Sequence, residues 1–95
     1  MVLEKDFQAK FIKRIRRLGV KCYKQQMNAT TRAGTPDYIC LLGPVWFFLE
    51  FKRAKNAKKR PGQQENIDWA NEVSFGWFCF PENEEEVYNA IKRLK

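Results

Sequence analysis

Residues 34–52 have the sequence GTPDYICLLGPVWFFLEFK. The apolar residues of this segment fall into two runs, 38–42 and 45–49, which a Gly43-Pro44 turn separates. A turn of this kind between two short apolar runs predicts a β-hairpin. The second run does not alternate with polar residues, which favours a central strand covered on both faces. The segment therefore predicts the middle of a sheet.

Two carboxylates lie at the open end of this predicted hairpin. Asp37 begins the first strand and Glu50 ends the second, so the hairpin brings them side by side. Lys52 is two positions after Glu50 and points to the same face of the strand. A buried carboxylate costs on the order of several kcal/mol unless it is paired, and a Glu50–Lys52 pair that only satisfies itself is one interpretation. Two carboxylates beside a lysine also form a hard oxygen site for Mg²⁺.

The segments on either side of the hairpin predict an α/β fold. In chain order we expect a helix over 3–18, a strand over 20–26, the two hairpin strands, a helix over 64–74, a strand over 77–80 and a last helix that carries Val87, Ala90, Ile91 and Leu94. The order αβββαβα predicts one α/β domain over residues 1–95, with helices flanking a central mixed sheet.

The spacing of apolar residues predicts which helix faces point inward. In the first helix Glu4 shares a stripe with Phe7, so we expect Glu4 to face the sheet rather than water. A Glu in a first turn also serves simply as a partner of the helix dipole. In the second helix we expect Ile67, Ala70 and Val73 to face inward.

The composition of the 95-residue chain limits its chemistry. Lys and Arg number 18 against 11 Asp and Glu, and the formal net charge is +7. A small basic domain suggests nucleic acid or an anionic surface as partner, although surplus lysine can also serve solubility alone. The chain has no histidine, which excludes Ser-His-Asp and Cys-His catalysis and HExxH zinc proteases. Three cysteines cannot form an all-cysteine zinc site.

The cysteines and the apolar segments bear on where the protein works. Cys22, Cys40 and Cys79 are odd in number and far apart, which argues against a disulfide framework and for a reducing, intracellular compartment. Charged residues interrupt the N-terminal segment at once, unlike a signal peptide, and no apolar run approaches the roughly 20 residues of a membrane span. We therefore expect a cytoplasmic protein that does not enter a membrane.

A basic segment begins at Lys52. Residues 52–60, KRAKNAKKR, hold six basic side chains in nine positions. A solvated loop or a nuclear localisation signal has the same composition. Because the segment adjoins the carboxylates, we expect it to clamp a phosphate backbone. The side chains expected to do so are Arg53, Lys55, Lys58, Lys59 and Arg60. No base-reading motif is present in the sequence, which favours recognition of DNA shape.

Three motifs, taken in order, resemble those of a known family. They are similar to the motifs of the PD-(D/E)XK nuclease superfamily, and within it to those of the virus-type replication-repair nuclease domain, VRR-NUC. The three are Gly34-Thr35-Pro36-Asp37, Glu50-Phe51-Lys52 and Gln64 at the start of a helix. Gln63 is adjacent to Gln64 and is the alternative for the third motif. The resemblance covers nearly the whole chain and implies a restriction-endonuclease-like fold.

The resemblance implies a metal site and a catalytic set. Asp37 and Glu50 would bind Mg²⁺ or Mn²⁺, with the backbone carbonyl of Phe51 as a third ligand. Glu4 would hold the metal through water or bind a second ion. Lys52 would stabilise the charge that develops on the scissile phosphate and orient the attacking water.

The resemblance extends to two further residues. Gln64 would position the attacking water or the Lys52 amine. Arg32, which precedes the first motif, also fits the family, and we expect it to contact DNA.

The implied activity is metal-dependent hydrolysis of DNA that leaves a 5′-phosphate and a 3′-hydroxyl. Small members of the family are similar to Holliday junction resolvases, so we expect a homodimer that cuts branched DNA, with aromatics such as Trp77 and Phe78 at the contact. The resemblance to a virus-type family also leaves a phage-encoded origin open. The alternatives are a nicking or restriction-type endonuclease and a non-catalytic nucleic-acid-binding domain.

Overall fold

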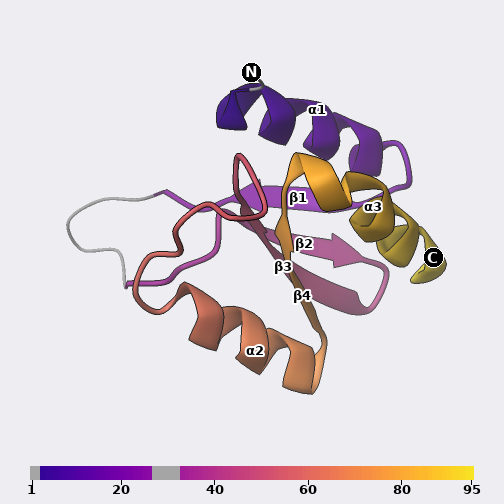
Figure 1. The fold of residues 1–95 in the computed structure, drawn as a ribbon. Helices are drawn as coiled ribbons and strands as arrows, with labels where there is room; N and C mark the ends of the chain where they lie inside the picture. Colours follow the sequence, from indigo (N-terminus) through magenta and orange to yellow (C-terminus); the bar gives the residue numbers. More distant parts are fainter. Residues whose placement is uncertain (1–2, 27–32) are drawn as a thin grey trace.

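A computed structural model describes residues 3–26 and 33–95 of the chain. Figure 1 shows the elements, which in chain order are α1 (Glu4–Arg16), β1 (Lys21–Lys24), β2 (Tyr38–Leu42), β3 (Val45–Phe51), α2 (Gln63–Val73), β4 (Phe75–Cys79), the short 3₁₀ helix η1 (Pro81–Asn83) and α3 (Glu84–Arg93). Apart from η1, this is the predicted order αβββαβα.

The four strands form one mixed sheet in the order β1-β2-β3-β4. β1, β2 and β3 pair antiparallel, and the crossover through α2 makes β4 parallel to β3. Helices α1 and α3 cover one face of the sheet and α2 covers part of the other (Figure 1). The predicted α/β fold with helices on both faces of a mixed sheet is therefore confirmed.

The main core lies between the sheet and helices α1 and α3. Phe47, Leu49 and Phe51 alternate along β3 and are fully buried in it. The ring of Phe51 makes edge-on contacts with the rings of Phe7 and Tyr38, at centroid distances of 5.8 and 5.9 Å. This packing fixes the end of β3, where the next residue back, Glu50, points to the opposite face.

Helix α2 buries a narrower face than the sequence predicts. Gln63, Ile67 and Ala70 are its buried residues, whereas Val73 is 59% exposed, so the inward prediction for Val73 is wrong. At about 100° per residue, Val73 lies roughly 90° around the helix axis from the buried three. The next residue on the buried stripe would be Ser74, where the helix has already ended.

Two of the three cysteines lie in the core. Cys40 and Cys79 are buried. The hydrogen bond with Cys22, followed by burial, raises the pKa of the Cys40 thiol, and burial raises the pKa of the Cys79 thiol, so both stay protonated and unreactive. Across residues 3–26 and 33–95, no helix has the length and apolar character needed to cross a membrane.

Candidate active site

Asp37 and Glu50 lie side by side at the open end of the β2–β3 hairpin. Tyr38 pairs with Leu49 in the antiparallel register, so the next facing position joins Asp37 to Glu50. Oδ2 of Asp37 accepts a hydrogen bond of 2.7 Å from the backbone N–H of Phe51. This bond fixes the Asp37 carboxylate against the strand that carries Glu50.

The Glu50 carboxyl group is buried, with only 2% of the residue exposed. Burial, followed by the hydrogen bond and charge of Asp37, raises the pKa of Glu50 to about 8, although the charges of Lys52 and Arg60 act in the opposite direction. Within the described part of the chain, Oε1 of Glu50 has no hydrogen-bond partner. A buried carboxylate oxygen without a donor, beside a second carboxylate, fits a hard divalent cation such as Mg²⁺ or Mn²⁺.

Glu4 is placed differently from the prediction. It is the first residue of α1 and is exposed, whereas Phe7, less than one helical turn further along the same stripe, is buried. It nevertheless lines a cavity of about 270 Å³ together with Lys52. Among the described residues, no three Asp, Glu, Cys or His side chains cluster to hold one metal, so Glu4 is not gathered with Asp37 and Glu50. Its contact with a metal through water stays a prediction.

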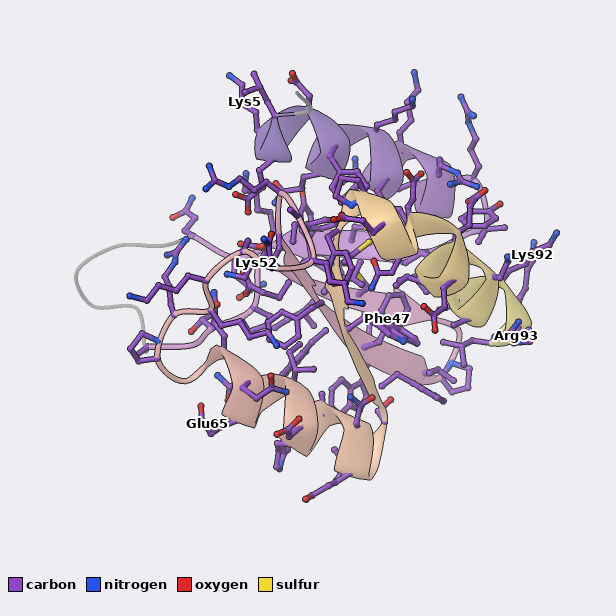
Figure 2. All side chains as sticks on the ribbon, in the orientation of Figure 1. Lys5, Phe47, Lys52, Glu65, Lys92 and Arg93 are labelled. Carbon is purple, nitrogen blue, oxygen red and sulfur yellow. The ribbon has the colours of Figure 1, made fainter. Side chains whose placement is uncertain are left out.

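Lys52 is held by the first residue of α2. It is 7% exposed, and its Nζ donates hydrogen bonds to Oε1 of Gln63 at 2.7 Å and to the backbone oxygen of Lys58 at 3.3 Å. Oε1 of Gln63 also accepts a 2.7 Å bond from the backbone N–H of Arg60. Gln63 therefore joins Lys52, which is labelled in Figure 2, to the loop before α2. We call Glu50, Lys52 and Gln63 the buried cluster.

Gln64 does not reach Lys52, which corrects the choice of Gln64 over Gln63. Its side chain is exposed, with Oε1 accepting from Lys59 Nζ at 2.9 Å and Nε2 donating to Asp68 at 2.8 Å. The helix begins at Gln63, one residue earlier than predicted, and successive helical residues point about 100° apart. Gln63 therefore faces the sheet and Gln64 faces away from it.

The basic loop, residues 53–62, divides between the cavity and its surroundings. Arg53, Lys58 and Arg60 are exposed and line the cavity beside Lys52. Lys59 instead lies over the ring of Phe78, with 4.4 Å between its Nζ and the ring centre.

Lys55, another predicted DNA contact, is not among the residues that line this cavity. Lys55 is exposed, and its backbone N–H donates to Glu82 at 3.1 Å. Arg32 lies outside the described residues.

One residue that shapes the site, Asn66, was not predicted from the sequence. Asn66 donates a 2.6 Å hydrogen bond to the backbone oxygen of Gly34 and so ties the first motif to α2. Gly34 packs so closely on Gly62 that an added Cβ would lie 2.4 Å from the carbonyl carbon of Gly62. Asn66 follows Gln63 by one helical turn, and this spacing was the available signal.

The chain shares its fold with a known class of nuclease-like α/β domain. A solved structure described as a VRR_NUC domain superposes with a TM-score of 0.71, at 22% sequence identity, over 90% of this chain and 94% of that one. No family model and no curated protein matches the chain. The structural likeness confirms the VRR-NUC fold that the three motifs predicted.

Proposed function

We propose that this chain is a metal-dependent endonuclease that hydrolyses phosphodiester bonds of DNA, and that its natural substrate is branched DNA. The observation that carries the proposal is the buried Lys52 amine beside the Asp37–Glu50 pair, at the edge of a cavity that exposed basic side chains line. The VRR-NUC fold supports the same reaction class.

Each residue of the site has a defined task in this proposal. Asp37 and Glu50 would hold Mg²⁺ or Mn²⁺, which supplies Lewis acidity toward the scissile phosphate. Lys52 would donate a hydrogen bond from Nζ to the phosphate oxygen on which charge develops. Gln63 orients Lys52 through the 2.7 Å hydrogen bond, and the exposed Arg53 and its neighbours would bind the flanking phosphates.

The test is cleavage of labelled four-way junction, flap and linear duplex, with Mg²⁺ and with EDTA. We expect cleavage only with the metal, and loss of cleavage in Asp37→Asn without loss of DNA binding. Glu65→Gln is the matched control, because Glu65 is an exposed acid on α2 whose side chain lies away from Lys52 (Figure 2). Undiminished cutting in EDTA, or by Asp37→Asn, would refute the metal assignment.

A homodimer would match the two symmetric cuts that a four-way junction needs. β4 is an edge strand, and on it the exposed Phe75 stacks on Trp77 with 5.7 Å between ring centres, which supports a contact between two chains there. Phe78 is instead covered by Lys59.

Sedimentation equilibrium tests the dimer directly. We expect twice the 11.3 kDa chain mass for the wild type, and a shift toward the single-chain mass for Phe75→Lys. Leu41→Lys is the control, because Leu41 on β2 has the same 38% exposure as Phe75. A single-chain mass for the wild type at all concentrations would contradict the dimer and leave single-strand nicking as the expected activity.

A further inference from the structure

A cluster of three aromatic rings lies on the sheet face that α2 covers only in part. Trp46 and Phe48 come from β3 and Trp69 from the outer part of α2. The rings of Trp46 and Trp69 stack at 28° with 5.6 Å between centres, and Phe48 lies 6.0 Å from Trp69. Trp69 is nevertheless 51% exposed, although burial of a ring this large stabilises a fold more than burial of most side chains.

Two rings of this cluster, Phe48 and Trp69, form one wall of a cavity of about 430 Å³. The residues that line it are Thr35, Pro36, Phe48, Asn66 and Trp69. The volume lies within the range of small-ligand pockets, and the lining combines aromatic faces with a hydroxyl and an amide. The bond from Asn66 to Gly34 fixes the loop side of the cavity against α2.

The cavity adjoins the carboxylate pair. Pro36 directly precedes Asp37 in the chain. Phe48 and Glu50 point to the same face of β3, so their Cα atoms are roughly 7 Å apart along the strand. A group in the cavity would therefore be next to a phosphate bound at Asp37 and Glu50.

We propose that this cavity receives one unstacked nucleobase from the strand whose phosphate lies at the carboxylates. The inference rests on the proposed nuclease function. Proteins that bind single-stranded nucleic acid combine a basic groove for the backbone with aromatic rings for the bases, and here the basic loop and the Phe48–Trp69 wall flank the same carboxylates.

The chemistry of the cavity selects an unpaired base over a paired one. A base inside a duplex already stacks on its neighbours and must be extruded at an energetic cost, whereas a base at a bulge, flap or branch point is free of part of that cost. Stacking on Trp69 uses a π-face that every base has, so it would select for DNA shape without selecting for sequence. The cavity would thus give the enzyme its preference for branched DNA.

The experiment compares two DNA probes in EDTA, where no cleavage occurs. One is a fully paired duplex and the other carries a single unpaired 2-aminopurine. For the wild type we expect tighter binding of the second probe and a change in 2-aminopurine fluorescence on binding. Trp69→Ala should reduce that preference by at least about fivefold, the lower end of what one stacked base contributes, whereas Trp69→Phe should retain most of it.

Val73→Ala is the matched control, because Val73 is an apolar residue on α2 of similar exposure (59% against 51% for Trp69) that does not line the cavity. Thermal unfolding of each variant checks that its fold is intact. The 2-aminopurine fluorescence of the wild type tests the inference even if a variant fails to fold. An unchanged preference in folded Trp69→Ala, or no fluorescence change in the wild type, would overturn the inference while leaving cleavage of DNA intact.

Two other outcomes would also show that the cavity does not bind a base. If Trp69→Ala alters the sedimentation mass but not the DNA preference, the aromatic wall is a protein contact and the inference is wrong. If the wild type neither binds nor cleaves any of the DNA substrates, the proposed nuclease function itself fails, and the inference fails with it.

Discussion

The buried cluster and the basic loop are adjacent in the fold, yet their side chains are held in opposite ways. Glu50, Lys52 and Gln63 are each less than 10% exposed, and Lys52 and Gln63 are bonded at 2.7 Å. Arg53 and Lys58, by contrast, are exposed on the wall of the 270 Å³ cavity beside Lys52. One region is therefore fixed before substrate arrives, and the other can adjust to it.

The difference follows from what each region has to do. A group that stabilises charge on one phosphate oxygen must be placed within a fraction of an ångström, which burial and hydrogen bonds achieve. Charges that attract a DNA backbone act over several ångströms and need no single conformation. We therefore expect substitutions in the buried cluster to change the rate of cleavage, and substitutions in the basic loop to change DNA affinity and its salt dependence.

The largest effect should come from Lys52→Ala. Removing a donor that stabilises transition-state charge typically lowers turnover about 100- to 1,000-fold, and we expect a loss of this size in single-turnover cleavage with Mg²⁺. DNA binding measured by anisotropy in EDTA should change far less. Loss of binding with an unchanged cleavage rate at saturation would place Lys52 with the basic loop instead.

Gln63 and Gln64 offer a matched pair within the same helix. Gln63→Ala removes the partner of Lys52, and loss of such supporting residues typically costs about 10- to 100-fold in activity. Gln64→Ala removes only exposed contacts with Lys59 and Asp68 and should leave the cleavage rate near that of the wild type. Equal losses in the two variants would show that orientation of Lys52 is not what Gln63 contributes.

These two glutamines also show what a single sequence can and cannot predict. The hairpin, with Asp37 and Glu50 at its open end, followed from two apolar runs and a Gly-Pro turn, because strand periodicity and turn chemistry are local. The choice between Gln63 and Gln64 depends on the exact first residue of α2, and a shift of one residue rotates a side chain by about 100°. Helix boundaries are set by contacts from elsewhere, here the Lys52 amine and the Arg60 backbone.

Glu4 and Trp69 were harder for a related reason. Phe7 is buried as its stripe predicts, but the stripe does not show how far along the helix burial extends, and Glu4 is exposed. Trp69 has a large apolar side chain of the kind that is usually buried. Only the three-dimensional structure shows that it is half-exposed and lines a cavity with Phe48. The exposure of both side chains depends on contacts between segments that are distant in the sequence, and the periodicity of apolar residues does not report such contacts.

The basic loop can be tested through salt dependence. Neutralising Arg53, Lys58 and Arg60 together should flatten the plot of log affinity against log salt by about 0.9 for each DNA phosphate that the variant no longer neutralises on a duplex. If the variant loses three such phosphate contacts, the affinity that it loses between 50 and 200 mM salt should be about 40-fold less than the affinity that the wild type loses. Neutralising Lys55 and Lys59, which do not line the cavity beside Lys52, should have a smaller effect on the slope. An unchanged slope in the triple variant would return the basic loop to the role of a solvated surface.

The last prediction concerns the stability cost of burying Glu50. Its native pKa of about 8 lies above the ordinary value of 4.5, so between these two pH values the folded protein holds a proton that the unfolded chain has released. The contribution of Glu50 to the free energy of unfolding of the metal-free protein should therefore be most favourable below pH 4.5. It should then fall as pH rises, by up to about 1.4 kcal/mol per pH unit, until Glu50 ionises near pH 8.

Glu50→Gln separates this effect from all other titrations. Glutamine cannot ionise, so the variant should lack the decline, and its stability relative to the wild type should grow steadily from pH 5 to pH 8. Urea unfolding in EDTA at pH 5, 6.5 and 8 measures the difference, with Glu65→Gln, at an exposed position, as the control for replacing a Glu by Gln. Because Gln also alters the hydrogen bond to Asp37, the change in slope with pH is the decisive quantity, and the absolute stability at one pH is not. Parallel slopes for the wild type and Glu50→Gln would mean that Glu50 is ionised throughout this range. Burial would then not distinguish the cluster electrostatically from the exposed loop beside it.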